Sequence, residues 1–184
     1  MWDFKSLEIL YRVKYHRGAI QALSFSCDEG LLASVGGKAD GNQLVLWNMD
    51  EGKSEVFQSA SQHQDQECND IAFFNRKPNK FVTVHNNAIK IWAFDMKGKK
   101  LSYFDCPLGH IKRFVQNISI DSIDEHAYCG TRSGDFLEVS LSKGIYNRAG
   151  PVDKKFTGAV TSVISKFKNL YVGAQDGTVS KIDK

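Results

Sequence analysis

The sequence is poor in proline, in paired cysteines and in long hydrophobic runs. Its 184 residues include 3 prolines and 4 cysteines, and no two cysteines have Cys-x-x-Cys spacing. The composition excludes a collagenous or low-complexity chain. Isolated cysteines, together with the lack of a signal peptide or transmembrane run, indicate a reducing, cytosolic setting. Helical periodicity is also missing, because no window of about ten residues keeps apolar side chains at i, i+3, i+4 and i+7. We therefore predict an all-β protein.

Groups for catalysis or ligand binding are equally sparse. Gly36-Gly37-Lys38 lacks the leading glycine and the following serine or threonine of a Walker phosphate loop. Histidine and cysteine occur only as isolated pairs, without the second pair that a zinc site needs. No nucleophile, base and orienting group occur together. We therefore predict a protein that is not an enzyme and that holds no cofactor or metal.

What the sequence does contain is a repeat marked by tryptophan. Trp2, Trp47 and Trp92 stand at equal intervals, and the same slot recurs as Val139 and Ile182. A turn pair and a short alternating strand precede each of the last four marks. A period in the forties that ends in such a strand is typical of one four-stranded β-propeller blade. We predict a partial β-propeller over residues 1–184, with about four blades of four antiparallel strands and repeat units at approximately 3–48, 49–93, 94–140 and 141–184.

Two further apolar runs precede the tryptophan slot in each unit. In the first unit, residues 19–25 alternate and residues 31–35 follow as a nearly continuous run. An outer strand is predicted after the tryptophan slots, at residues 7–15, 54–57 and 100–105, because edge strands tolerate the polar residues found there.

The two ends of the sequence predict open sheet edges. Residues 1–3 read as the end of a tryptophan strand whose own blade is missing, and residues 182–183 end another such strand. Three arrangements follow. Residues 7–15 could pair beside residues 178–182 and close a four-bladed ring, the blades could form an open arc, or two chains could exchange strands.

The repeats resemble the WD-repeat family. In that family a histidine before the first inner strand, a hydroxyl residue on the middle strand and the tryptophan that ends the third strand hydrogen-bond together and fasten the blade. The resemblance implies this structural role for the following residues: His16, Ser34 and Trp47 in the first unit, Thr83 and Trp92 in the second, His110 in the third, and the Asp176-Gly177 turn in the fourth.

The later units depart from the family pattern. The second unit lacks the histidine, the third has Val139 in place of tryptophan, and the fourth has Ile182. A buried indole N–H needs a hydrogen-bond partner, so an aliphatic residue in its place removes the polar network and leaves plain packing. We therefore predict that blades three and four are held differently from the first two.

Several strings are similar to a narrower group, the two-propeller WD-repeat proteins of motile cilia and flagella that line the inner wall of axonemal doublet microtubules. The strings are residues 20–26, Gly36-Gly37 before Asp40, residues 129–135, and Gly150-Pro151 followed by residues 155–162. The resemblance implies part of the first propeller of a non-catalytic scaffold in the cytoskeleton, located in the cilium or flagellum axoneme. The implied partners are tubulin and other axonemal proteins, with no nucleic acid, membrane or small-molecule substrate.

Basic clusters near predicted strand ends are candidate contacts for an acidic partner such as tubulin. The chain has 24 Lys and Arg against 21 Asp and Glu, a net charge of +3, so each cluster could equally serve only solubility. The candidates are Lys97, Lys99, Lys100, Lys112, Arg113, Lys154, Lys155, Lys166 and Lys168.

Two other classes of function remain open at this point. A general cytosolic adaptor would use the same blades to bind partner proteins in a complex unrelated to cilia. An enzyme built on a propeller scaffold would need a catalytic constellation that the sequence does not display.

Overall fold

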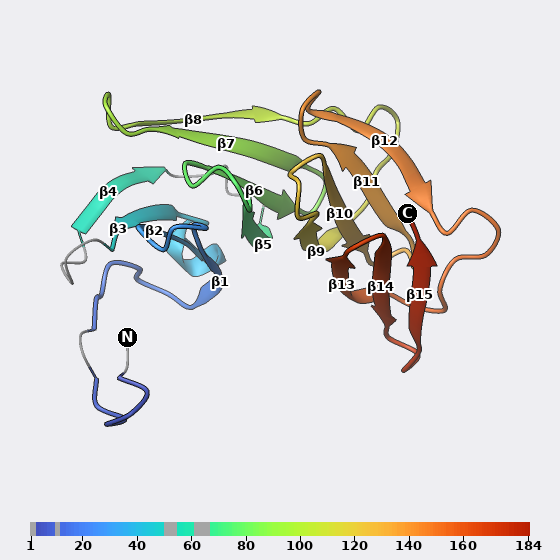
Figure 1. The fold of residues 1–184 in the computed structure, drawn as a ribbon, viewed down its shortest axis with the longest axis horizontal. Coiled ribbons are helices and arrows are strands. Elements are labelled where there is room, and N and C mark those ends of the chain that lie inside the picture. Colours follow the sequence, from blue (N-terminus) through green and yellow to red (C-terminus); the bar gives the residue numbers. More distant parts are fainter. Residues whose placement is uncertain (1–2, 10–11, 50–54, 61–66) are drawn as a thin grey trace.

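The computed structural model describes residues 3–9, 12–49, 55–60 and 67–184. The described residues form fifteen β-strands and one 3-10 turn, η1 (Lys38–Asp40). The strands build four separate antiparallel sheets, three of four strands and one of three, in which neighbours in sequence pair. The sheets stand side by side as blades in an open arc, with β1, β5, β9 and β13 innermost (Figure 1). The predicted all-β propeller architecture is confirmed.

Each blade runs outward from its innermost strand. The first blade contains β1 (Ile20–Phe25), β2 (Leu31–Gly36), β3 (Leu44–Asn48) and β4 (Glu55–Ala60). The second contains β5 (Cys68–Phe73), β6 (Lys80–His85), β7 (Ile89–Asp95) and β8 (Lys100–Asp105). The third contains β9 (Val115–Ile120), β10 (His126–Thr131), β11 (Phe136–Ser140) and β12 (Ile145–Gly150), and the fourth contains β13 (Val160–Lys166), β14 (Asn169–Ala174) and β15 (Val179–Asp183).

The blades share one strand register. Each innermost strand carries an irregularity at its second residue, where one extra residue faces the neighbouring strand; the residues are Gln21, Asn69, Gln116 and Thr161. Such a bulge bends the strand and increases its twist. Counting from it places Ser34, Thr83, Cys129 and Val172 at one equivalent position on the second strand.

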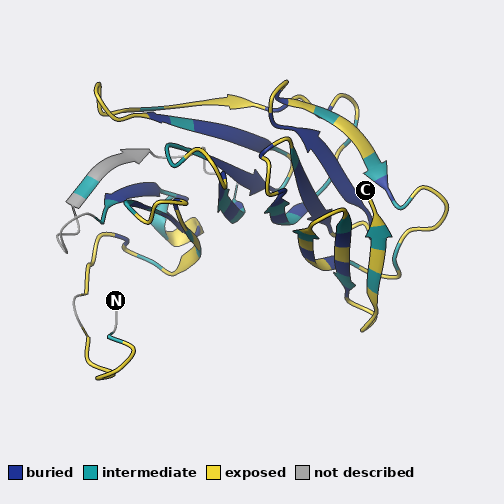
Figure 2. Cartoon of the chain, in the orientation of Figure 1, coloured by how far each residue is buried: buried dark blue, intermediate teal, exposed yellow. Residues whose placement is uncertain are grey.

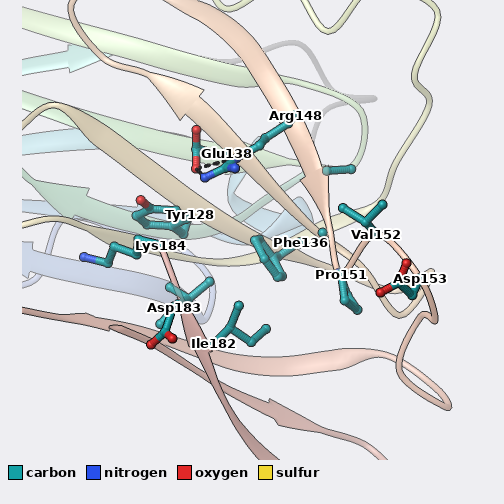
Figure 3. Close-up of a pocket in the computed structure, with 13 residues that line it drawn as sticks. Tyr128, Phe136, Glu138, Arg148, Pro151, Val152, Asp153, Ile182, Asp183 and Lys184 are labelled. Atoms are coloured by element: carbon teal, nitrogen blue, oxygen red, sulfur yellow. Dashed lines mark hydrogen bonds and ion pairs between the residues drawn. The ribbon is translucent and has the colours of Figure 1, made fainter. Parts of the chain in front are cut away.

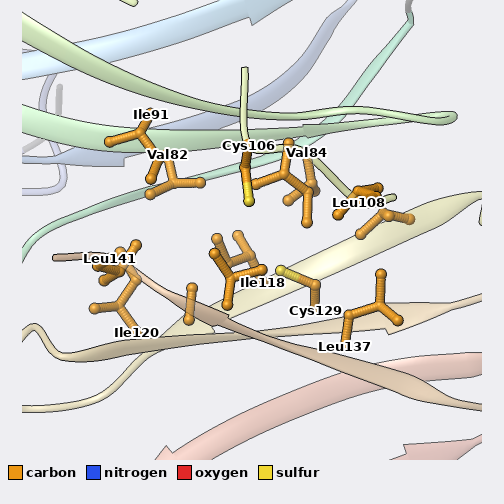
Figure 4. Packing of buried hydrophobic residues seen from close by; sticks show 14 of the residues in the cluster. Val82, Val84, Ile91, Cys106, Leu108, Ile118, Ile120, Cys129, Leu137 and Leu141 are labelled. Atoms are coloured by element: carbon orange, nitrogen blue, oxygen red, sulfur yellow. The ribbon is translucent and has the colours of Figure 1, made fainter. Parts of the chain in front are cut away.

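The core lies between the blades rather than within them. Three hydrophobic clusters each join two neighbouring sheets. Figure 4 shows the cluster between the second and third blades, where Val82 and Ile91 face Ile118, Ile120 and Leu137. No blade could bury both faces alone, so stacking supplies the hydrophobic stabilisation of this fold.

Side chains on the innermost strands supply several of the hydrogen bonds between blades. Ser24 Oγ accepts the backbone N–H of Phe73 at 3.3 Å, and Ser119 Oγ accepts that of Ser165 at 2.9 Å. Between the second and third blades, Asp70 Oδ2 accepts the N–H of Ile118 at 3.0 Å. These single bonds align neighbouring innermost strands, while the four sheets keep separate backbone ladders.

The two ends of the arc expose apolar faces. Leu23 on β1 is 58% exposed and Ile164 on β13 is 56% exposed, whereas the equivalent strands of the inner blades are largely covered (Figure 2). The first and fourth blades stand at opposite ends of the arc (Figure 1). Within one chain the arrangement is therefore an open arc and not a closed four-bladed ring.

The outer strand predicted for residues 7–15 is wrong where the structure describes it. Residue 9 forms an isolated bridge and residues 12–15 adopt no strand, while residues 10–11 lie outside the described residues. An edge strand needs a partner for its backbone groups, and β15 lies at the far end of the arc (Figure 1). The outer strand predicted for residues 100–105 is present as β8, and that for residues 54–57 overlaps β4 from Glu55 onward.

Candidate functional site

The first blade is fastened by a chain of four buried polar groups. Trp47 Nε1–H donates to Ser34 Oγ at 2.8 Å, and Ser34 Oγ lies 2.7 Å from His16 Nε2. His16 Nδ1 lies 2.5 Å from Asp40 Oδ2, and the backbone N–H of Arg17 donates to Asp40 Oδ1 at 2.6 Å. With Nδ1–H donating to the carboxylate, Nε2 is free to accept the serine hydroxyl proton. The loop before β1 is thus tied to three successive segments of the blade.

Asp40 is the one residue of this hydrogen-bonded network whose role only the structure reveals. Burial acts to raise the pKa of its carboxyl, but hydrogen bonds from His16 and from the Arg17 N–H outweigh burial and lower that pKa. The sequence predicts Asp40 as a turn residue, and it is the last residue of the short turn η1.

The second blade has a histidine after all. Trp92 Nε1–H donates to Thr83 Oγ1 at 2.8 Å, and that hydroxyl lies 2.8 Å from Nε2 of the fully buried His85. The prediction that this unit lacks a histidine was wrong, because the family pattern places the histidine ahead of the first inner strand, whereas His85 lies on β6. His85 lies two residues after Thr83 on β6, and side chains two apart on a strand point to the same face.

The third blade replaces the tryptophan network with a charged one. Val139 and Cys129 are fully buried among hydrophobic residues at the tryptophan and hydroxyl positions. The polar contacts move to Asp135, which accepts from Arg113 Nε at 3.0 Å and from Lys155 Nζ at 2.6 Å. Thr131 Oγ1 also donates to it. Burial acts to raise the pKa of Asp135, but the bonds from Lys155, Thr131 and Arg113 outweigh burial, so the pKa is lowered.

His110 does not take the place that the sequence suggested. Its side chain is exposed, whereas Arg113, three residues later in the same loop, reaches the buried Asp135. In the fourth blade, Asp176 is also exposed and accepts from the N–H and the hydroxyl of Thr178, at 3.0 and 2.6 Å. Gly177 has φ +84°, which a glycine adopts without strain. This turn is local and joins no buried network in the described residues.

The basic candidates separate onto two faces. Strands alternate in direction along the chain, so the β7–β8 and β13–β14 connections lie at one end of the blades, here called the tip face. The inter-blade loops 106–114 and 151–159 lie at the opposite end, the loop face. The tip face carries exposed Lys97, Lys99, Lys100, Lys166 and Lys168, and the loop face carries Lys112, Arg113, Lys154 and Lys155. Because Arg113 and Lys155 bind Asp135, they are structural in this chain rather than simple free surface charges.

A cavity of about 260 Å³ lies between the third and fourth blades (Figure 3). Tyr128, Phe136 and Ile182 form its apolar wall, and Glu138 pairs with Arg148 at 2.9 Å on its rim. In the second blade Tyr103 of the outer strand packs on Trp92, with ring centroids 4.6 Å apart. Ile182 occupies the corresponding slot of the fourth blade and lines the cavity. The sequence offered no signal for this cavity.

The thiols differ sharply in accessibility, and this predicts their reactivity. Cys68, Cys106 and Cys129 are buried, while Cys27 is exposed. Burial raises the pKa of Cys68 to about 12 and that of Cys106 to about 11, which suppresses the reactive thiolate. We expect iodoacetamide to modify Cys27 in the folded protein and the other three only after unfolding, as followed by mass spectrometry. Modification of Cys106 as fast as Cys27 would contradict the inter-blade packing.

The described residues contain no group of three or more histidine, cysteine or acidic side chains arranged to hold a metal ion. No helix in the described part of the chain has the length and apolar character needed to cross a membrane.

The stacked antiparallel sheets, together with the tryptophan–hydroxyl–histidine networks of the first two blades, define an arc of WD-repeat β-propeller blades. The sequence resembles Cilia- and flagella-associated protein 52, as the ciliary strings predicted. It is 35% identical to the Chlamydomonas reinhardtii protein over 185 residues and 31% identical to the Bos taurus protein over 178 residues. These matches cover 100% and 96% of this chain but 29% and 28% of the relatives. No protein-family model matches the chain.

Solved structures support the fold. The β-propeller domain of Cps50 (Swd1) from Myceliophthora thermophila superposes with a TM-score of 0.78 at 16% identity, covering 99% of this chain and 57% of that domain. The computationally designed Ika4 protein superposes with a TM-score of 0.73 at 21% identity, covering 96% of this chain and 98% of that protein. At these identities the likeness concerns the fold alone.

Proposed function

We propose that this chain is part of a non-catalytic structural WD-repeat protein of motile cilia or flagella, which binds inside axonemal doublet microtubules and supports ciliary motility. The observation that carries the proposal is the similarity to Cilia- and flagella-associated protein 52 over 100% of the chain. The buried networks of the first three blades support it, since their polar residues hydrogen-bond to one another and fasten loops to strands. Tubulin and neighbouring axonemal proteins are the proposed partners.

The surface charges fit this proposal. Tubulin is acidic, and the tip face presents exposed lysines on the second and fourth blades. Long-range attraction of this kind speeds encounter with an acidic partner and is screened by salt, whereas packed contacts persist.

The proposal predicts strong retention in axonemes. The parent protein would be tagged in a flagellated cell, and axonemes would be extracted with detergent and then with high salt. We expect the tagged protein to stay with the doublet fraction, because an enclosed, packed component is not released by charge screening. An unfused tag, which should wash out, is the control. Release into the soluble fraction would overturn the proposal and favour a general cytosolic adaptor.

A further inference from the structure

The turn between β13 and β14 exposes a large aromatic residue in a strained conformation. Phe167 is 82% exposed and has φ +52°, in the left-handed region that bulky residues rarely adopt. The equivalent turns of the first and third blades place Glu29 and Asp124 at positive φ, and both are polar. An exposed phenylalanine here therefore carries a hydration cost and a backbone cost together. Strain of this kind often marks a functional position.

Lys184, directly after β15, holds the β13–β14 turn by hydrogen bonds. Lys184 Nζ donates to the carbonyl oxygen of Phe167 at 2.9 Å and to Ser165 Oγ at 2.5 Å, and the Lys184 N–H donates to the Lys168 carbonyl at 3.0 Å. Lys166 Nζ lies 5.5 Å from the centroid of the Phe167 ring. Because these bonds fix the backbone of the turn, the position from which the Phe167 ring projects is defined before a partner binds, and this lowers the entropy cost of binding.

The surroundings are basic and partly apolar. Lys166 and Lys168 flank the ring and are exposed, and the neighbouring β9–β10 turn exposes Ile123. Asp124 in that turn is buried, and its carboxylate accepts the backbone N–H groups of Asn75 and Arg76 at 2.7 and 2.8 Å. Glu125 is the exposed acid of the turn. The β13–β14 turn thus combines one projecting aromatic side chain with a lysine on each side of it in sequence.

We propose that Phe167, with Lys166 and Lys168, docks an acidic segment of a partner protein that also carries an apolar or aromatic side chain. The ring would pack against that side chain, and the two lysines would pair with carboxylates beside it. A few anchor side chains, aromatic residues prominent among them, carry most of the binding energy of a protein interface. A nucleic-acid surface would need several stacking aromatics along a basic groove, whereas here one aromatic stands on a projecting turn. The inference rests on the proposed structural function and names its contact point.

The test is a titration of the 184-residue chain with a labelled glutamate-rich peptide that carries one central tyrosine. Phe167→Asn removes the ring and suits the left-handed backbone, so we expect binding to weaken about tenfold while the unfolding midpoint is unchanged or higher. Phe4→Asn is the matched control. Phe4 is 93% exposed, has Lys5 beside it, and lies in the segment before the first blade, at the other end of the arc from Phe167. That variant should bind as the parent chain does.

A second variant tests the charges. Lys166→Glu combined with Lys168→Glu should weaken peptide binding and flatten its dependence on salt concentration. Unchanged affinity of Phe167→Asn would overturn the proposal. The proposal would also be overturned if the parent chain bound single-stranded DNA or phosphatidylserine vesicles instead of the peptide and if Phe167→Asn lost that binding. Failure of axonemal retention with intact peptide docking would instead count against the proposed function alone.

Discussion

Replacement of Trp47 by alanine is expected to lower the free energy of unfolding by about 3–5 kcal/mol, the range for deleting a large aromatic side chain from a core. Trp47 is 5% exposed, and its indole N–H satisfies Ser34 in the buried network of the first blade. The alanine would leave both a cavity and a hydroxyl with one lost partner. Urea denaturation followed by circular dichroism would measure the change.

Trp47→Phe separates packing from hydrogen bonding. Phenylalanine fills much of the space but has no N–H, so the loss should be about 1–3 kcal/mol, the range for an unsatisfied buried partner. An unfolding midpoint that does not move in Trp47→Ala would mean that the assigned register of the blade is wrong.

Replacement of Asp135 by asparagine should lower the free energy of unfolding at pH 7 by about 2–3 kcal/mol, since hydrogen bonds to a buried charge contribute about that much. Asp135 accepts from Thr131, Arg113 and Lys155, and the neutral amide would leave both cations without their carboxylate. Because Lys155 is about half exposed, water recovers part of its loss.

The pH dependence gives this prediction a sign. The pKa of Asp135 is lowered in the folded protein, so its stabilisation is complete above the unfolded value of about 3.9 and is lost as the pH falls through the lower folded value. The difference between the parent chain and Asp135→Asn should therefore shrink below about pH 4. Asp176→Asn is the control, because Asp176 is fully exposed and should change stability far less. A gap that persists unchanged in acid would contradict the assigned ion pairs.

Most of the architecture could be predicted because each blade repeats one pattern. The turn pair, the alternating strand and the tryptophan slot recur, so the positions of β3, β7, β11 and β15 followed from residues close together in sequence. The prediction for residues 7–15 failed because strand formation there depends on a partner far away in the chain. Local alternation cannot reveal whether such a partner is within reach.

The networks were harder to predict for a related reason. His16, Ser34 and Trp47 were named together from the family resemblance, and the structure places them in hydrogen-bond contact. In the second and third blades, His85 and Arg113 make buried hydrogen bonds from other positions. His85 lies inside a strand, and Arg113 lies later in a loop. A fixed motif cannot register such relocation, although the same-face position of His85 relative to Thr83 was visible in the strand alternation.

The separation of the four sheets has a mechanical consequence. Within a blade, force passes along ladders of backbone hydrogen bonds, but between blades it passes through the connecting loops, side-chain packing and scattered hydrogen bonds such as those of Ser24, Asp70 and Ser119. Each blade should therefore behave as a stiff plate, and bending should concentrate at the seams between plates. A load applied along the arc would shear apolar surfaces past one another before it opened any strand, so the compliance of this molecule is set by the residues that line its three seams.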